Sequence, residues 1–173
     1  LKHMKKTLLV TFFTLGFIGL SLSLTPEEKA KEIETIYKKL FAAKGHGHNA
    51  PKFIFDENKG SVAYMNLDKD GRPFIAFESL AYDVCAEFGD RKEDAIALLL
   101  GHEISHYTEG HKWGGQFRSS YSLGSLEKEI RKVDRDTNQL TKFEVEADVK
   151  GGILCYMAGY DLEGLSEKLM RRL

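Results

Sequence analysis

Two histidines and a glutamate near the middle of the chain have the spacing of a zinc site. Residues 102–106 read His-Glu-Ile-Ser-His. On a helix, the four-residue spacing places the imidazoles of His102 and His106 on one face, where both can bind the same zinc ion. Zinc lowers the pKa of a bound water towards ~7, and a carboxylate beside it can accept the proton and later deliver it to a leaving amine. Glu103 is therefore predicted to be the catalytic base.

A five-residue pattern of this kind also occurs by chance, as a helix with two ordinary histidines, so its surroundings must decide. The preceding residues are apolar almost all round the helix, which predicts a helix buried in the core. Burying charged groups costs several kcal/mol unless they are paired or bound to a metal. Metal binding is the simpler explanation for two histidines and a glutamate in that setting.

A catalytic zinc normally takes a third protein ligand and leaves one position to water. The metzincin pattern is excluded, because His111 stands one residue out of register. Downstream, Glu144 and Asp148 lie one helical turn apart on the same face, whereas Glu146 points roughly the opposite way. Glu144 is the predicted third ligand, and Glu146 is the alternative. Asp148 is predicted to accept a hydrogen bond from the far nitrogen of a zinc-bound histidine.

Small residues accompany these acids. Ala147, Gly151 and Gly152 fall on or near the face that carries Glu144. Each mid-helix glycine costs roughly 1 kcal/mol relative to alanine, so we expect them to permit a close approach to the 102–106 helix. The competing interpretation of Glu144 and Asp148 is an exposed acidic helix face.

The extended pattern resembles a known family. His102-Glu103-Ile104-Ser105-His106 with His111 five residues on, Ala147-Asp148 with Gly151, and the later Ala158-Gly159-Tyr160-Asp161 resemble the HtpX-like and CAAX-prenyl-endopeptidase family of gluzincin metallopeptidases, over roughly residues 50–173. The resemblance implies the same roles for the two histidines, Glu103, Glu144 and Asp148.

The chain differs from the membrane-embedded members of that family. It has no hydrophobic span after the N-terminal one, so it resembles the soluble, exported relatives, and prenyl-protein processing is not expected. It also lacks the long C-terminal repeat region of some soluble relatives, as a minimal catalytic domain or a shortened chain would.

Composition narrows the choice of partners. The 173 residues include 25 Lys and Arg against 26 Asp and Glu, so no excess positive charge is available to bind nucleic acid. The length is typical of one domain, expected here at residues 25–173. Cys85 and Cys155 lie far apart in the sequence and are interpreted as two small buried side chains, with a disulfide as the alternative.

The N-terminal segment, residues 1–24, is predicted to be an export signal. Lysines after Met4 precede the apolar run Leu8 to Leu20 and small residues suited to a signal peptidase. Leu1–His3 stand before the initiator methionine and look like a cloning remnant. We expect a periplasmic or cell-envelope protein, with an uncleaved membrane anchor as the alternative.

Hydrophobic periodicity predicts an α+β fold of the zincin type, in which a small antiparallel sheet covers the 102–106 helix and a second helix supplies Glu144. The expected helices span residues 25–44, 79–88, 90–110, 138–157 and 162–173, with an exposed helix near 127–136. The expected strands are 53–55, 61–65 and 73–77. The last of these is expected to form the cleft rim and pair with an extended substrate.

The expected activity is zinc-dependent hydrolysis of peptide bonds in a protein or peptide substrate, with one Zn²⁺ per chain. An oxyanion-stabilising donor is sought among Tyr107, His111, Arg118 and Tyr121. Two alternatives remain. One is a catalytically silent zinc-binding scaffold or regulator of the cell envelope. The other is a self-inhibited peptidase whose cleft is covered by residues 25–44 or 112–125.

Overall fold

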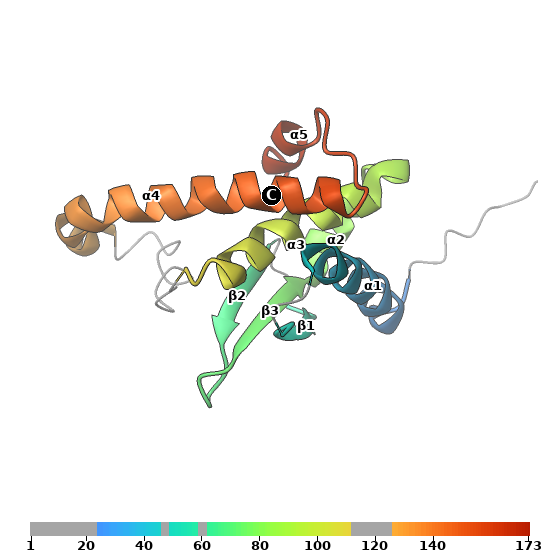
Figure 1. Ribbon diagram of the computed structural model, residues 1–173, viewed down its shortest axis with the longest axis horizontal. Helices are drawn as coiled ribbons and strands as arrows, with labels where there is room; N and C mark the ends of the chain where they lie inside the picture. Colours follow the sequence, from blue (N-terminus) through green and yellow to red (C-terminus); the bar gives the residue numbers. More distant parts are fainter. Residues whose placement is uncertain (1–23, 46–48, 59–61, 112–125) are drawn as a thin grey trace, which may run out of the picture.

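A computed structural model describes residues 24–45, 49–58, 62–111 and 126–173, with only the backbone described for residues 126–140 and Met170 (Figure 1). The elements in chain order are α1 (Pro26–Lys44), β1 (Lys52–Asp56), β2 (Ala63–Leu67), β3 (Pro73–Glu78), α2 (Ser79–Ala86), the 3₁₀ turn η1 (Gly89–Arg91), α3 (Lys92–Thr108), α4 (Leu126–Met157) and α5 (Ser166–Met170). The mixed α+β class and the three short strands agree with the sequence prediction.

The sheet is mixed, so the prediction of a purely antiparallel sheet was wrong. Its order is β1-β3-β2, with β2 antiparallel and β1 parallel to β3. The turn at 68–72 joins β2 to β3 as a hairpin, while the chain from β1 passes to the far side of β3. Short apolar runs predict only that a strand is present, because the side-chain pattern is the same whether the strand pairs parallel or antiparallel.

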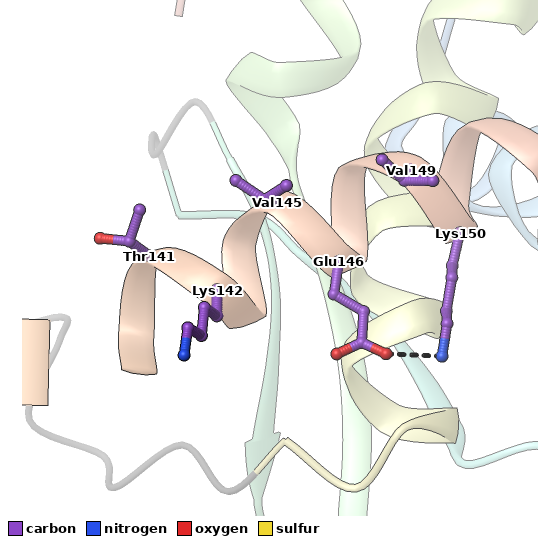
Figure 2. Close-up of a pocket in the computed structure, with 6 residues that line it drawn as sticks. All are labelled: Thr141, Lys142, Val145, Glu146, Val149 and Lys150. Carbon is purple, nitrogen blue, oxygen red and sulfur yellow. Dashed lines mark ion pairs between the residues drawn. The ribbon is translucent and has the colours of Figure 1, made fainter. Parts of the chain in front are cut away.

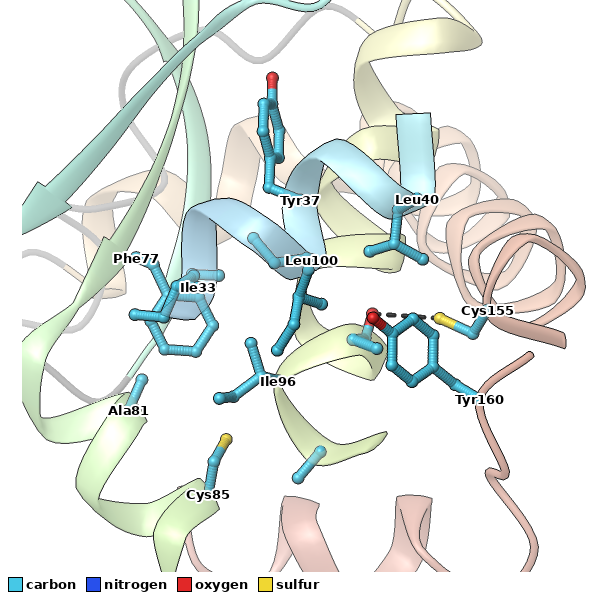
Figure 3. Close-up of a cluster of buried hydrophobic side chains, with 14 of the residues drawn as sticks. Ile33, Tyr37, Leu40, Phe77, Ala81, Cys85, Ile96, Leu100, Cys155 and Tyr160 are labelled. Atoms are coloured by element: carbon cyan, nitrogen blue, oxygen red, sulfur yellow. Dashed lines mark hydrogen bonds between the residues drawn. The ribbon is translucent and has the colours of Figure 1, made fainter. Parts of the chain in front are cut away.

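Helix α3 lies between the sheet and α4, which crosses above it (Figure 1). Its apolar residues Ile96, Leu100 and Ile104 are fully buried, as its sequence predicts. Helix α1 packs against α3 and contributes Ile33 and Leu40 to the same core (Figure 3). The 102–106 segment is therefore held on its two sides by the sheet and by α4.

The residues at the helix ends explain most differences between the predicted and the observed helix boundaries. Helix α1 begins with a capping box between Thr25 and Glu28, at the start of the expected 25–44 helix. Helix α3 begins at Lys92 after η1, and Arg91 at its N-cap makes no side-chain cap, so the helix starts two residues later than the expected range of 90–110. The two helices expected on either side of residue 137 form one continuous α4, because the junction between them, Asp136-Thr137-Asn138, contains no glycine or proline.

Both cysteines are buried and unpaired, as interpreted from the sequence. The Sγ of Cys155 donates a hydrogen bond to the Ala97 carbonyl at 3.0 Å, which ties α4 to α3 (Figure 3). Within the described part of the chain, no helix has both the length and the apolar character needed to cross a bilayer. The predicted export signal falls outside the described residues, apart from Leu24.

Candidate metal centre

Three side chains from two helices converge where α4 crosses α3. The Nε2 atoms of His102 and His106 are 2.9 Å apart. From α4, Glu144 places its Oε2 3.3 Å from the Nε2 of His102 and its Oε1 3.7 Å from the Nε2 of His106. The structure therefore brings together the two histidines and the glutamate that the sequence singles out, with their ligand atoms within 4.8 Å of one another.

The donor set fits a zinc ion. Two ligands about 2.05 Å from a tetrahedral zinc are about 3.3 Å apart. The separations here are 2.9 Å between the two imidazoles, and 3.3 and 3.7 Å from them to the two oxygens of the Glu144 carboxylate. The Oε1 of Glu144 is buried and has no hydrogen-bond partner. A buried carboxylate oxygen without a partner is costly, and a cation among these three donors would satisfy it. Imidazole and carboxylate are both ordinary zinc ligands.

Two glycines make the crossing of α3 and α4 close enough for a shared metal. A Cβ built on Gly151 would lie 2.8 Å from the carbonyl carbon of Gly101 and from the amide nitrogen of His102. A Cβ on Gly101 would lie 2.7 Å from the Sγ of Cys155. The helices thus touch backbone to backbone one residue before the first histidine. Gly152 faces elsewhere, with its nearest neighbour Leu162 at 4.0 Å, so only part of the predicted small-residue face serves this contact.

Asp148 lies where the sequence places it, one turn after Glu144. Its Oδ1 is 2.8 Å from the Nδ1 of His102. If His102 bound a metal through Nε2, its Nδ1–H would donate to this carboxylate, which would fix both tautomer and ring orientation. The Asp148 side chain is 73% exposed, and that of His102 is 23% exposed.

The electrostatics of the metal-free site separate the two histidines. Burial alone would lower the pKa of His102, but the neighbouring carboxylates, Glu144 foremost, outweigh it and raise that pKa to about 9. Burial, reinforced by the positive charge of His102, lowers the pKa of His106 to about 3. At neutral pH the Nε2 of His102 therefore carries a proton, and it faces both the Oε2 of Glu144 at 3.3 Å and the Nε2 of the neutral His106 at 2.9 Å. A metal ion would take the place of that proton.

Glu103 is held by the sheet. Its Oε2 accepts a hydrogen bond from the amide N–H of Met65 in β2 at 2.8 Å. Burial raises the pKa of Glu103 to about 7, against the lowering effects of His102 and of the Met65 amide. Burial thus brings the pKa of this carboxyl nearer to neutrality than that of a free glutamate, a range that suits general acid–base catalysis.

Several other predictions change with the structure. Both ring nitrogens of His111 already face protein groups, and the Tyr107 hydroxyl donates to the carbonyl of Asn49, so neither is placed as an oxyanion donor. Arg118 and Tyr121 lie outside the described residues. Strand β3 is the central strand with neighbours on both edges, so the expectation that it forms the cleft rim was wrong.

Sequence reasoning missed the part played by His111 and Glu146. Glu146 does not reach the three ligand atoms, and its Oε2 lies instead 3.4 Å from the Nε2 of His111. The available signal was Gly110 before His111, directly after the helix, since a glycine there turns the next residue back onto the last turn. Comparisons of the chain with protein-family models, curated proteins and solved structures found no match.

Proposed function

We propose that the chain is a zinc-dependent endopeptidase of the gluzincin type, with a zincin-like arrangement of sheet, α3 and α4. His102, His106 and Glu144 are its zinc ligands, Glu103 is its base, and Asp148 orients His102. The observation that carries this assignment is the buried, unpartnered Oε1 of Glu144 beside two imidazole nitrogens. A purely structural acidic helix face would leave that oxygen in water or give it a donor.

Zinc bound here would polarise the scissile carbonyl and make water a better nucleophile. The proton transfers are carried out by Glu103. Glu103 takes a proton from the attacking water as the new carbon–oxygen bond forms, and delivers it to the amide nitrogen as the carbon–nitrogen bond breaks. Burial, which in the metal-free site raises the pKa of Glu103 to about 7, favours both directions of transfer. The hydrogen bond from the Met65 N–H holds the Glu103 carboxylate in place between the two proton transfers.

Strand β2 is the better candidate for the substrate-binding strand. Among the described strands it has a neighbour only on its β3 side. The Met65 N–H points away from β3 towards Glu103, so the outward-facing backbone groups of β2 run past the base. An extended peptide added to this edge would be bound largely by main-chain hydrogen bonds. We therefore expect weak sequence selectivity, and cleavage-site profiling that returned one strict motif would contradict it.

The assignment is tested by measuring zinc content and cleavage of quenched peptides in the same preparations. Glu103→Gln should keep one zinc per chain and lower kcat by about 10²–10⁴-fold, because the base is gone. Glu93→Gln, an exposed glutamate in the first turn of the same helix, is the matched control and should behave as wild type. A wild type that binds zinc and cleaves nothing before or after limited proteolysis would favour the scaffold role instead.

A further inference from the structure

We propose that His111 is a positioning residue for the zinc ligand His106: it accepts a hydrogen bond from the His106 Nδ1–H and is itself anchored on Glu146. This role rests on the proposed zinc site and adds to it a second supported histidine. It also gives a function to Glu146, which lies near the site without reaching the ligand atoms.

The way α3 ends places His111 against His106. The amide N–H of His111 donates to the carbonyl of His106 at 3.0 Å, and that of Gly110 donates to the carbonyl of Tyr107 at 3.2 Å. Gly110 has a φ of 68°. These are the two hydrogen bonds and the left-handed glycine of a Schellman motif, in which the residue after the glycine contacts the residue five positions earlier. That contact is usually apolar, whereas here it joins two imidazoles.

The proton positions follow from the ring contacts. The Nδ1 atoms of His106 and His111 are 2.9 Å apart, so one of them must carry a hydrogen. If His106 binds the metal through Nε2, its proton is on Nδ1 and it is the donor. His111 then accepts at Nδ1 and carries its own proton on Nε2, which faces the Oε2 of Glu146 at 3.4 Å. This single proton assignment gives a partner to each ring nitrogen of His106 and His111, with the metal as the partner of the His106 Nε2.

The outer end of this chain is fixed by packing and charge. Phe143 stacks on the His111 ring, with centroids 4.2 Å apart and planes at 23°. Glu146 pairs with Lys150 at 2.6 Å, and Figure 2 shows the two side chains extending the same way from α4. Lys150 also pairs with Glu109 at the end of α3. His111 is only 4% exposed, so its orientation is set by these neighbours rather than by solvent.

Supporting residues of this kind typically contribute 10–100-fold in metal affinity, because they hold the ligand ring in its binding orientation before the metal arrives. A side chain that only filled the space beside His106 would contribute shape and no acceptor. The two cases separate on a pair of substitutions. Phenylalanine fills the space and stacks on Phe143 but accepts nothing, whereas glutamine offers a carbonyl oxygen to His106 and an amide to Glu146.

The experiment measures Zn²⁺ dissociation constants by chelator competition, and the visible absorption of the Co²⁺-loaded protein, for wild type, His111→Phe and His111→Gln. We expect His111→Phe to bind Zn²⁺ about 10–100-fold more weakly and to change the Co²⁺ spectrum. His111→Gln should recover most of that loss. Equal, wild-type affinity in both variants would overturn the positioning role.

A second pair keeps the test decisive if the phenylalanine variant does not fold. Glu146→Met removes the acceptor for His111, whereas Glu146→Gln keeps one, and both lose the ion pair with Lys150 equally. We expect weaker Zn²⁺ binding for Glu146→Met than for Glu146→Gln, and equal binding would contradict the anchor. If wild type binds Zn²⁺ and cleaves peptides while all four variants bind like it, only the role of His111 fails. If wild type binds no Zn²⁺, the proposed function fails with it.

Discussion

His102 and His106 lie one turn apart on the same helix, yet their surroundings differ. His102 is partly exposed and contacts Asp148, a carboxylate that faces solvent. His106 is fully buried and contacts His111, which is buried as well and backed by Glu146. The buried pair of His106 and His111 cannot rearrange without disturbing the end of α3. Water, in contrast, can replace much of the exposed contact between His102 and Asp148. We infer that His106 is held in place in advance and that His102 is the ligand that adjusts when a metal binds.

Removing the Glu144 carboxylate, which faces both histidines, should weaken Zn²⁺ binding more than any other substitution considered. The carboxylate of Glu144 faces the Nε2 atoms of both His102 and His106. We expect Glu144→Ala to weaken Zn²⁺ binding by more than the ~100-fold upper range of a supporting residue, measured by chelator competition. Glu167→Ala, an exposed acid on α5 paired with Arg171, should leave affinity unchanged. A Glu144→Ala protein with wild-type affinity would remove Glu144 from the ligand set.

The helix crossing beside His102 offers a matched pair of glycine substitutions. Gly151→Ala forces a Cβ against the backbone of Gly101 and His102, so we expect the free energy of unfolding to fall by about 1–3 kcal/mol and Zn²⁺ affinity to fall with it. Gly152→Ala meets only an ordinary contact with Leu162 and should gain up to about 1 kcal/mol of helix stability. Thermal or urea unfolding measures both. Similar changes in the two variants would mean that the helices do not touch at Gly151.

The two histidines should also differ in their response to pH. His102 has a metal-free pKa of about 9 and must lose its proton to bind Zn²⁺, whereas His106 is already neutral. We therefore expect Zn²⁺ affinity to rise about tenfold per pH unit from pH 6.5 towards pH 9. In the metal-free protein the sign is opposite. The stability contributed by protonated His102 is fully present below pH 6.5 and is lost as pH rises through about 9.

Calorimetry in buffers of different ionisation enthalpy checks the proton count directly. The count is made at pH 6 on the Glu103→Gln variant, in which the side chain at position 103 has no proton to lose and a zinc-bound water, with a pKa of about 7, mostly keeps its own. Close to one proton should be released per Zn²⁺ bound, after correction for zinc speciation. Release of two protons from this variant would mean that both histidines are charged in the free protein, and the electrostatic difference between them would be lost.

The smallest effect is expected on the exposed side. Asp148→Asn keeps an acceptor oxygen for the Nδ1–H of His102 and sits largely in water, so we expect Zn²⁺ affinity to fall by about tenfold, the lower end for a supporting residue. Measured beside His111→Phe, this variant ranks the two sides of the site. A larger loss for Asp148→Asn than for His111→Phe would reverse the inference that the buried histidine is the better supported one.

The parts of the molecule that could be predicted from sequence are those set by local periodicity. The burial of α3 follows from its nearly continuous apolar surface, and the start of α1 beside Thr25 from the cap-forming residue types there. The convergence of His102, His106 and Glu144 could be predicted because two histidines four residues apart and a glutamate on a second helix match the ligand set of known zinc sites.

The missed features depend on tertiary contacts. The parallel pairing of β1 with β3 leaves no trace in strands of five or six residues, so the choice of β3 as the rim failed. His111 looked like a free donor because its partner Glu146 lies 35 residues away on another helix. The Gly151 contact with Gly101 was foreseeable only as a tendency, since Gly152 beside it has the same sequence signature and points elsewhere.

Anomalous diffraction at the zinc absorption edge, on crystals grown with one equivalent of Zn²⁺, tests the central claim most directly. We expect one strong peak bounded by the Nε2 atoms of His102 and His106 and the carboxylate of Glu144. Asp148 should contact His102, and His111 should contact His106, without touching the ion. A peak elsewhere, or a site with a different third protein ligand, would contradict the proposed metal centre and the peptidase assignment built on it.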